Sequence, residues 1–115
     1  MKALTVAAAA LAVVNGSARA ESGIASLYST REIGTNTASG HHLDDDALTA
    51  AHKTLPFGSR VRVTNHANGR SVVVTITDRG PYSRGRVIDL TPAGGRVLGF
   101  SRLARVTLER VGNDS

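Results

Sequence analysis

The chain has 115 residues, a formal charge of +5 at pH 7, no cysteine, 12 glycines and only 3% aromatic residues. This length suits one domain with a modest core, and the lack of cysteine excludes a disulfide framework and a thiol for a lipid anchor. Abundant glycine with few aromatic residues favours short strands joined by tight turns over a helical bundle.

The first twenty residues have the pattern of an export signal. Lys2 precedes an apolar stretch, residues 3–14, that is too short to cross a bilayer, and Ala18-Arg19-Ala20 has the small-x-small form that signal peptidases cut. A buried N-terminal helix fits less well, because no polar face accompanies the apolar stretch. We therefore expect residues 1–20 to be a signal peptide. Residues 21–115 would be a soluble domain without a membrane anchor, either periplasmic or secreted.

The first half of the expected domain contains two strands and a long loop. Ser22 to Ser29 is typical of a strand, with Ile24 and Leu27 as candidates for burial. The polar stretch from Thr30 to Asp46 predicts a long loop, and Leu48 to His52 predicts a second, short strand.

A β-hairpin is the clearest element of the sequence. Its strands run from Arg60 to His66 and from Ser71 to Thr77, and Asn68-Gly69 is the preferred pair for a two-residue type I′ turn. This turn predicts Val63 opposite Val74, Val61 opposite Ile76 and Ser59 opposite Asp78. The apolar side chains of both strands would then share one face, with Arg60, Arg62 and Thr75 on the other.

The last third of the chain predicts a strand, a short helix and a closing strand. Arg86–Leu90 is typical of a buried strand, and Thr91-Pro92 supplies an N-cap and a first-turn proline for a helix that ends at Gly99. Leu103 to Val111 alternates as a final strand, with Val106 and Leu108 inward.

Two short polar segments are candidates for a functional site. Asp78 ends the alternating strand and precedes Arg79-Gly80-Pro81, while His52-Lys53 ends the short strand. A carboxylate at the end of a strand suits proton transfer, and it also suits bracing of the turn that follows. Both interpretations are open at this point.

Other ionisable residues favour structural or solvent-exposed roles. Asp89 is typical of an acid that satisfies backbone donors near a helix start, with a second catalytic carboxylate as the alternative. The cluster formed by His41, His42 and the three aspartates Asp44–Asp46 predicts a solvated acidic loop, since neighbours along a loop do not converge as ligands unless the fold makes them. We therefore expect neither a metal nor another cofactor.

The basic charge indicates an anionic partner. Leaving out Lys2 and Arg19 lowers the net charge from +5 to +3 for the domain alone, with its arginines dispersed along the sequence. For an exported protein, an acidic glycan or a cell wall is a more suitable partner than nucleic acid.

The succession of motifs resembles the rare lipoprotein A family over nearly the whole expected domain. The order and spacing of the blocks make the resemblance specific, and the blocks are Ala25-Ser26-x-Tyr28, Thr37-Ala38-Ser39-Gly40, residues 48–58, Val61-x-Val63-Thr64-Asn65, Asn68-Gly69-Arg70, Asp78-Arg79-Gly80-Pro81 and Arg86–Leu90. The resemblance implies a six-stranded double-psi β-barrel, related to barwins and expansins. It also implies a lytic transglycosylase that acts on peptidoglycan strands stripped of stem peptides.

The resemblance also implies which residues form the site. The proposed catalytic aspartate of the family corresponds to Asp78, its site histidine to His52 and its upstream acid to Asp44. We expect these three side chains to converge in one groove. Where many members have glutamate after the Ser-Gly pair, this chain has His41, which is then expected beside the substrate.

The chemistry needs one group that moves a proton. In a lytic transglycosylase the muramic 6-hydroxyl of the substrate attacks the anomeric carbon, so one carboxyl group that acts first as acid and then as base is sufficient. Asp78 is the candidate proton carrier. Lys53 and Arg79 are candidates for holding the lactyl carboxylates of muramic acid, and Tyr28 and Tyr82 for an aromatic sugar platform.

Two functions from different classes remain open. The first is a monomeric enzyme that cuts peptidoglycan glycan strands and leaves 1,6-anhydromuramic ends. The second is a non-catalytic polysaccharide-binding barrel of the expansin or barwin type, which the exchange at His41 allows. A secreted effector or inhibitor is a third possibility.

Overall fold

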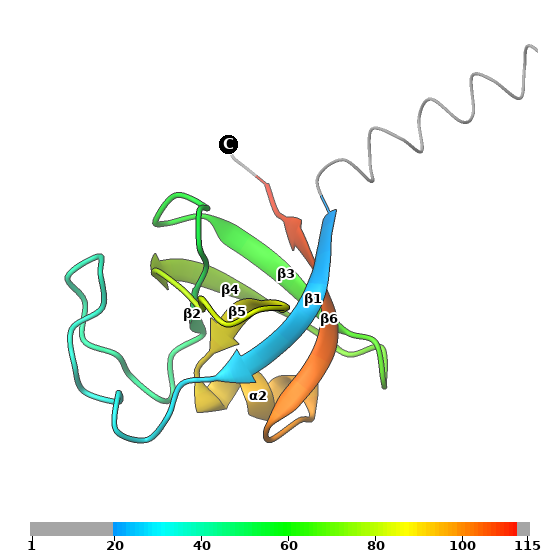
Figure 1. Cartoon of the computed structure of the whole chain (residues 1–115), viewed down its shortest axis with the longest axis horizontal. Helices are drawn as coiled ribbons and strands as arrows, with labels where there is room; N and C mark the ends of the chain where they lie inside the picture. Colours follow the sequence, from blue (N-terminus) through cyan, green and yellow to red (C-terminus); the bar gives the residue numbers. More distant parts are fainter. Residues whose placement is uncertain (1–19, 113–115) are drawn as a thin grey trace, which may run out of the picture.

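Six strands form a closed barrel in the computed structural model, which describes residues 20–112 (Figure 1). The elements in chain order are β1 (Ala20–Leu27), β2 (Thr49–Ala51), β3 (Arg60–Asn65), β4 (Ser71–Asp78), β5 (Arg86–Leu90), α2 (Pro92–Leu98) and β6 (Leu103–Arg110). The expected six-stranded barrel with a short helix is confirmed. The expected signal peptide lies, except for Ala20, outside the described residues. Within residues 20–112, no helix has the length and apolar character needed to cross a membrane.

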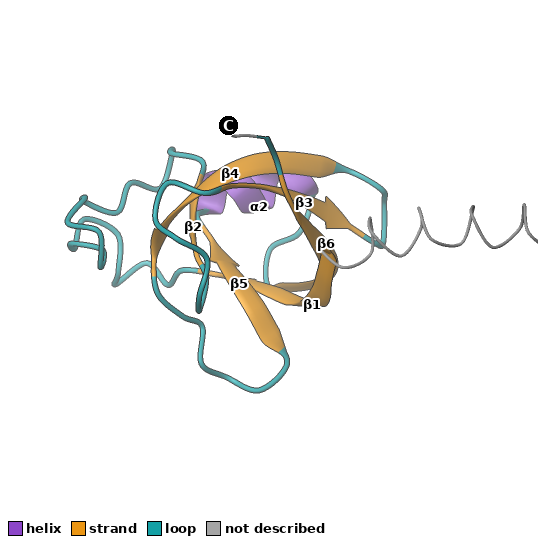
Figure 2. Ribbon diagram, turned by 90° about the horizontal axis from the view of Figure 1, so that it is seen from above, coloured by secondary structure: helices purple, strands orange, loops and turns teal. Residues whose placement is uncertain are grey.

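The strand order around the barrel is β1-β5-β2-β4-β3-β6, so neighbours in space are mostly distant in sequence (Figure 2). Two pairs, β1 with β5 and β2 with β4, are parallel, and the other four are antiparallel. Parallel neighbours need crossover connections, which here include the long loop between β1 and β2. That loop projects from one side of the barrel (cyan in Figure 1).

The barrel interior follows the alternation of the sequence. On β3 and β4 the buried aliphatic side chains are Val61, Val63, Val72, Val74 and Ile76, all within one core cluster. Arg60 and Arg62 lie on the outer, exposed face, as expected. Burying each such aliphatic side chain contributes about 1.5–3 kcal/mol, so this hairpin is a large part of the stability of the fold.

The hairpin has a different register from the expected one. Val61 pairs with Val74 and Val63 with Val72, a shift of two residues that leaves the same side chains inward. A type I′ turn needs positive φ at both central residues, and Asn68 does not have it, whereas Gly69 has φ 76°. The loop instead has four residues, and the Asn65 N–H donates to the Arg70 carbonyl at its base, 2.8 Å away.

The side chain of Asn65 accounts for this longer loop. It is 2% exposed; its Oδ1 accepts from the Ala67 N–H at 3.0 Å and its Nδ2 donates to the Leu98 carbonyl at 2.9 Å. Asn68 Nδ2 donates to the same carbonyl. The hairpin end is therefore fixed to the C-terminus of α2, a contact that local turn preferences do not contain.

Strand β1 also differs in detail from the expectation. Its inward positions are Gly23 and Ala25, whereas Ile24 and Leu27 are half-buried. A methyl group added at Gly23 would lie 2.4 Å from Val87 Cγ1, so only glycine fits between β1 and β5 there. The irregular pairing between Ile24 and Ala25 marks the point where the strand adjusts to both neighbours.

Helix α2 begins and ends where the sequence predicts. Thr91 is the N-cap, its Oγ1 accepting from the Gly94 N–H, and Gly99 is the left-handed C-cap with φ 80°. Gly95 has a packing reason, because a Cβ there would lie 2.9 Å from Leu27 Cδ2. Thr91 also donates to the Ala47 carbonyl at 2.6 Å and so ties the long loop to the barrel.

Candidate active site

Asp78 ends β4 with its carboxylate held by three donors. Its Oδ2 accepts from the Tyr28 hydroxyl at 2.8 Å, and its Oδ1 accepts from the backbone N–H groups of Ala38 and Arg79, both at 2.9 Å. The residue is half-buried. Donors on both oxygens fix the direction of this carboxylate. The bonds from Tyr28 and Ala38 also connect the long loop between β1 and β2 to the end of β4.

The Tyr28 hydroxyl donates its hydrogen bond to Asp78 from a buried position. Its ring is 7% exposed and packs with Leu43 and Ala51, away from the main core. Burial, followed by the hydrogen bond to Asp78, raises the pKa of Tyr28 far above its ordinary value. The phenol therefore keeps its proton at all physiological pH values. This position supports a role in orienting Asp78, whereas the ring has little open area for stacking on a sugar.

A second carboxylate, Asp89, lies on the other side of Ala51. Ala51 of β2 pairs with Asp78 on β4 and with Asp89 on β5, so the two acids flank one small residue. Neighbouring strands are about 4.8 Å apart, which puts the two aspartate Cα atoms roughly 10 Å from each other. Sequence reasoning treated Asp89 mainly as a structural acid, because the three-strand juxtaposition is not visible in one strand.

The surroundings of Asp89 disfavour its charged form. Burial raises the pKa of Asp89 above its ordinary value of 3.8, with the hydrogen bond from the Ser26 hydroxyl acting against this and the charge of Glu32 adding to it. Ser26 and Tyr28 also line an open hollow of about 460 Å³. Solvent or a ligand in that hollow therefore reaches the partners of both carboxylates.

Replacing Asp89 by asparagine is expected to change the pH dependence of stability. Asp89 ionises at a lower pH in the unfolded chain than in the folded chain. Between about pH 3 and pH 7, the contribution of Asp89 to the free energy of unfolding therefore falls as the pH rises. Asp89→Asn lacks this loss and should gain stability relative to the native chain as the pH rises. Urea unfolding at both pH values measures it, with Asp45→Asn as an exposed control. A difference that stays constant or moves the other way would contradict the buried-acid interpretation.

His52 is held by a separate set of partners. Its ring is 5% exposed; Nδ1 accepts from the N–H groups of Thr54 and Leu55, both at 3.1 Å. Nε2 then carries the proton and donates to Glu21 Oε1 at 2.8 Å, a tautomer inferred from this network. Its backbone N–H donates to the Asp78 carbonyl at 3.1 Å. Among the described residues, no hydrogen bond joins the imidazole to either the Asp78 or the Asp44 carboxylate.

Two of the expected cationic residues bind backbone carbonyls. Arg79 Nη1 donates to the carbonyls of His52 and Leu55 at 3.2 and 2.9 Å, and its guanidinium lies 4.1 Å from the centre of the Phe57 ring. Lys53 Nζ donates to the Arg86 carbonyl at 3.0 Å and is exposed. Tyr82 is 76% exposed. Arg79 and His52 together hold the 52–58 segment in one conformation.

His41 and Asp44 lie in a cavity of about 480 Å³ beside the long loop. Its other lining residues are mainly small or hydroxylated, namely Ser39, His42, Ala47, Thr49, Phe57, Gly58, Thr75, Ile76 and Thr77. His41 Nδ1 shares a hydrogen bond with Ser39 Oγ at 2.9 Å, and Asp44 Oδ1 accepts from the Asp46 N–H. Thr77, which precedes Asp78, connects this cavity to the end of β4.

Asp44, Asp78 and His52, which we expected in one groove, have different neighbours in the structure. Asp44 lines the cavity, Asp78 faces Tyr28 at the barrel end, and His52 faces Glu21. The carboxylate oxygens of Asp44, Asp45 and Asp46 lie within 4.8 Å of one another, all exposed, and Arg96 pairs with Asp46 at 3.1 Å. Exposed acids of this kind are common without an ion, and the expectation of no metal stays a prediction.

Comparison with known proteins gives one matching family model and several curated relatives. The model, described as "Lytic transglycolase", matches residues 20–109. A Nostoc protein named "Probable endolytic peptidoglycan transglycosylase RlpA" is 55% identical over 94 residues, which are 78% of this chain and 25% of the relative. The Yersinia pestis "Endolytic peptidoglycan transglycosylase RlpA" is 51% identical over 87 residues, 76% of this chain and 24% of the relative. The chain therefore spans about a quarter of the length of these relatives.

Solved structures show the same fold at lower identity. The apo expansin of Clavibacter michiganensis matches with a TM-score of 0.65 and 19% identity, over 84% of this chain and 52% of the expansin. The Streptomyces papain inhibitor matches with a TM-score of 0.61 and 22% identity, over 81% of this chain and 94% of the inhibitor. At these identities the likeness concerns the barrel fold.

Proposed function

The chain belongs to the RlpA-like family of double-psi β-barrels, and from this premise we propose that it is an endolytic peptidoglycan transglycosylase. It would cut the bond between N-acetylmuramic acid and N-acetylglucosamine in strands without stem peptides and leave 1,6-anhydromuramic ends. The relatives carry this activity in their names, and this chain shares about half of its residues with them over the barrel.

The geometry around Asp78 is the observation that carries the proposal. A half-buried carboxylate at a barrel end, oriented by a phenol and two backbone N–H groups, is preorganised to exchange a proton with a bound sugar. In the reaction the muramic C1–O bond breaks and a C1–O6 bond forms. The leaving 4-oxygen gains a proton and the 6-hydroxyl loses one, so a single carboxyl group that donates and then accepts balances the step without water.

Asp89 supports a two-carboxylate version of the same step. Burial raises the pKa of Asp89, which increases the share of protonated carboxyl at a given pH and suits donation to the leaving oxygen, while Asp78 accepts the 6-hydroxyl proton. Asp89→Asn separates the versions: release of anhydro products is lost if Asp89 donates and retained if Asp78 acts alone.

The remaining site residues are proposed to bind or to position. Asp44 and His41 would contact sugar hydroxyls in the cavity that they line. Lys53 and the exposed Tyr82 would contact the glycan, Lys53 through its carboxylates, and Arg79 would act through the Phe57 ring and the 52–58 segment that it holds. Tyr28 and His52 would act through the groups they hold, namely the Asp78 carboxylate and the 52–58 segment.

A non-catalytic polysaccharide-binding barrel is the second candidate. Two features favour it: the resemblance to the family leads us to expect glutamate where this chain has His41, and Asp78 accepts from three protein donors, which also suits a bracing role. Incubating the full chain with denuded peptidoglycan and analysing soluble products by mass spectrometry tests both. Anhydro-saccharides support the enzyme, whereas binding to pelleted glycan without release supports the binding barrel.

We also propose export of the chain through residues 1–20 to the periplasm or the medium, and action as a monomer on the wall. The apolar stretch and the small-x-small site support the signal peptide, and the cell-wall activity named for the relatives supports the location. N-terminal sequencing of the exported protein checks the expected start at Glu21.

A further inference from the structure

We infer that Phe57 and the arginines Arg60 and Arg110 form a binding subsite for a carboxylate-bearing glycan, with a sugar ring on Phe57 and its acid group at the arginines. The inference deepens the proposed function, on which it rests for the identity of the glycan. Sequence reasoning assigned these roles to the tyrosines, Lys53 and Arg79.

Phe57 lies where two hollows meet. Together with Gly58 it lines the cavity of about 480 Å³ described above, and the same two residues line a second hollow of about 410 Å³. Its side chain is 43% exposed although it belongs to an ordered turn. A ligand that extends from one hollow to the other would therefore pass over this ring.

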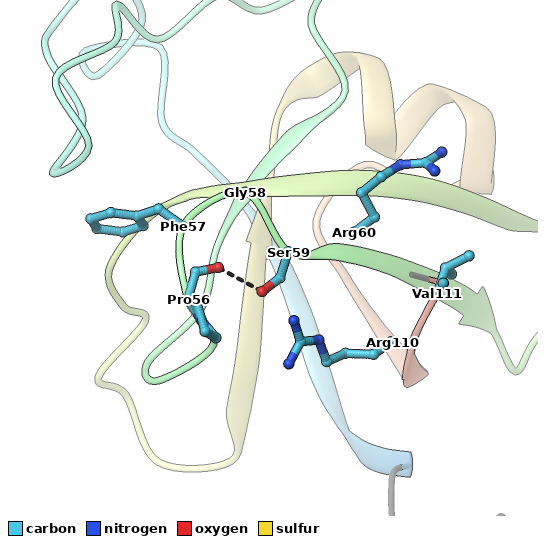
Figure 3. A pocket seen from close by; sticks show the side chains of 8 residues that line it. Pro56, Phe57, Gly58, Ser59, Arg60, Arg110 and Val111 are labelled. Atoms are coloured by element: carbon cyan, nitrogen blue, oxygen red, sulfur yellow. Dashed lines mark hydrogen bonds between the residues drawn. The ribbon is translucent and has the colours of Figure 1, made fainter. Parts of the chain in front are cut away.

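The ring is fixed from behind. The Arg79 guanidinium covers one of its faces at 4.1 Å, and the same guanidinium donates to the carbonyls of His52 and Leu55. The turn is closed by the Ser59 hydroxyl, which donates to the Pro56 carbonyl at 2.6 Å (Figure 3), and by the Gly58 N–H, which donates to Ile76. A rigid aromatic side chain with one free face costs little ordering when a sugar stacks on it.

The second hollow carries the positive charge. Arg60 and Arg110 line it from adjacent strands, β3 and β6; Figure 3 shows the Arg110 guanidinium directed towards Ser59 and Pro56, and the Arg60 guanidinium directed away from them. Both arginines are exposed, and neither forms an ion pair within residues 20–112. Glu21 lines another hollow together with Arg110, and it accepts from His52. Two arginines without an ion pair on the rim of one hollow give it a positive charge that suits a carboxylate.

The two hollows have different lining chemistry, so a bound glycan would have a preferred orientation across them. The first offers the hydroxyls of Ser39, Thr49 and Thr75, the His41 imidazole and the Asp44 carboxylate, which suit neutral sugar hydroxyls, whereas the second offers guanidinium groups. A polymer that alternates neutral and acidic sugars fits this arrangement, because adjacent residues would meet the two chemistries in turn. A neutral glycan would leave the arginines without a partner.

Binding is measured on the full chain in an Asp78→Asn background, so that the glycan stays intact. The probes are soluble denuded glycan strands and the same strands with their carboxyl groups reduced to alcohols. Phe57→Leu should weaken binding about tenfold, while Phe57→Tyr should keep it within about twofold, because the ring is retained.

Arg60→Gln with Arg110→Gln should weaken binding of the carboxylated strands about tenfold and remove most of its salt dependence. The matched control is Arg62→Gln with Arg105→Gln, which changes the same charge on the same two strands at exposed positions that line none of the described hollows. Carboxyl-reduced strands should bind the native and doubly substituted chains equally. Thermal unfolding of every variant separates a binding loss from a folding loss.

The outcomes keep this inference apart from the proposed function. If the native chain releases no anhydro product but binding depends on Phe57 and the two arginines, the subsite stands and the enzyme proposal fails. If the native chain cleaves, while both sets of variants bind like their controls or reduced strands bind as well as carboxylated ones, the subsite is overturned and the enzyme proposal stands.

Discussion

Replacing Asp78 by asparagine should stop release of 1,6-anhydromuramic products from denuded peptidoglycan, with a loss of about 10²–10⁴-fold in rate. The amide cannot exchange a proton with the glycosidic oxygen or with the 6-hydroxyl. Its oxygen can still accept from the N–H groups of Ala38 and Arg79, and the Tyr28 hydroxyl can turn to accept from its nitrogen. The substitution therefore removes the chemistry while preserving the contacts that hold the barrel end.

The matched control for this experiment is Asp45→Asn, a neutralised acid that is exposed on the long loop. It should retain activity within about twofold, and both variants should unfold within a few degrees of the native chain. Products are counted by mass spectrometry after equal incubation. Anhydro products from Asp78→Asn at the native rate would remove Asp78 from the catalytic step.

Replacing His52 by alanine should cost about 2–3 kcal/mol of folding free energy, the largest stability loss expected among the site residues. The change leaves the N–H groups of Thr54 and Leu55 without their acceptor and removes the donor to Glu21. It also leaves a cavity, because His52 is only 5% exposed. For a domain of this size, such a loss lowers the melting temperature by roughly 10 °C or more. Thermal unfolding followed by circular dichroism measures it.

His52→Asn distinguishes a positioning role from a catalytic one. The asparagine Oδ1 can occupy the place of Nδ1 and accept from the same two N–H groups, so part of the stability should return. If His52 acts by holding the 52–58 segment, cleavage recovers together with stability. A stable His52→Asn chain without cleavage, beside an active Glu21→Gln chain, would instead require the imidazole itself in the reaction.

Recognition of the family needed only the sequence, because the order and spacing of short motifs are one-dimensional properties. The assembly of the site needed more. Asp78 receives donors from Tyr28 and Ala38, which lie 50 and 40 residues earlier in the chain. Asp89 comes beside it through β2, the strand that lies between them. The platform at Phe57 was missed because its exposure depends on the Arg79 stack and on the two hollows that flank it.

By itself, the sequence determined the elements whose causes are local. Alternation predicts the faces of β3 and β4, and Thr91, Pro92 and Gly99 bound the helix, because caps and side-chain periodicity act within a few residues. Only the tertiary structure decided the hairpin register and the partners of His52. Asn65 binds Leu98 33 residues away and His52 binds Glu21 31 residues away, so barrel closure, rather than local preference, sets both contacts.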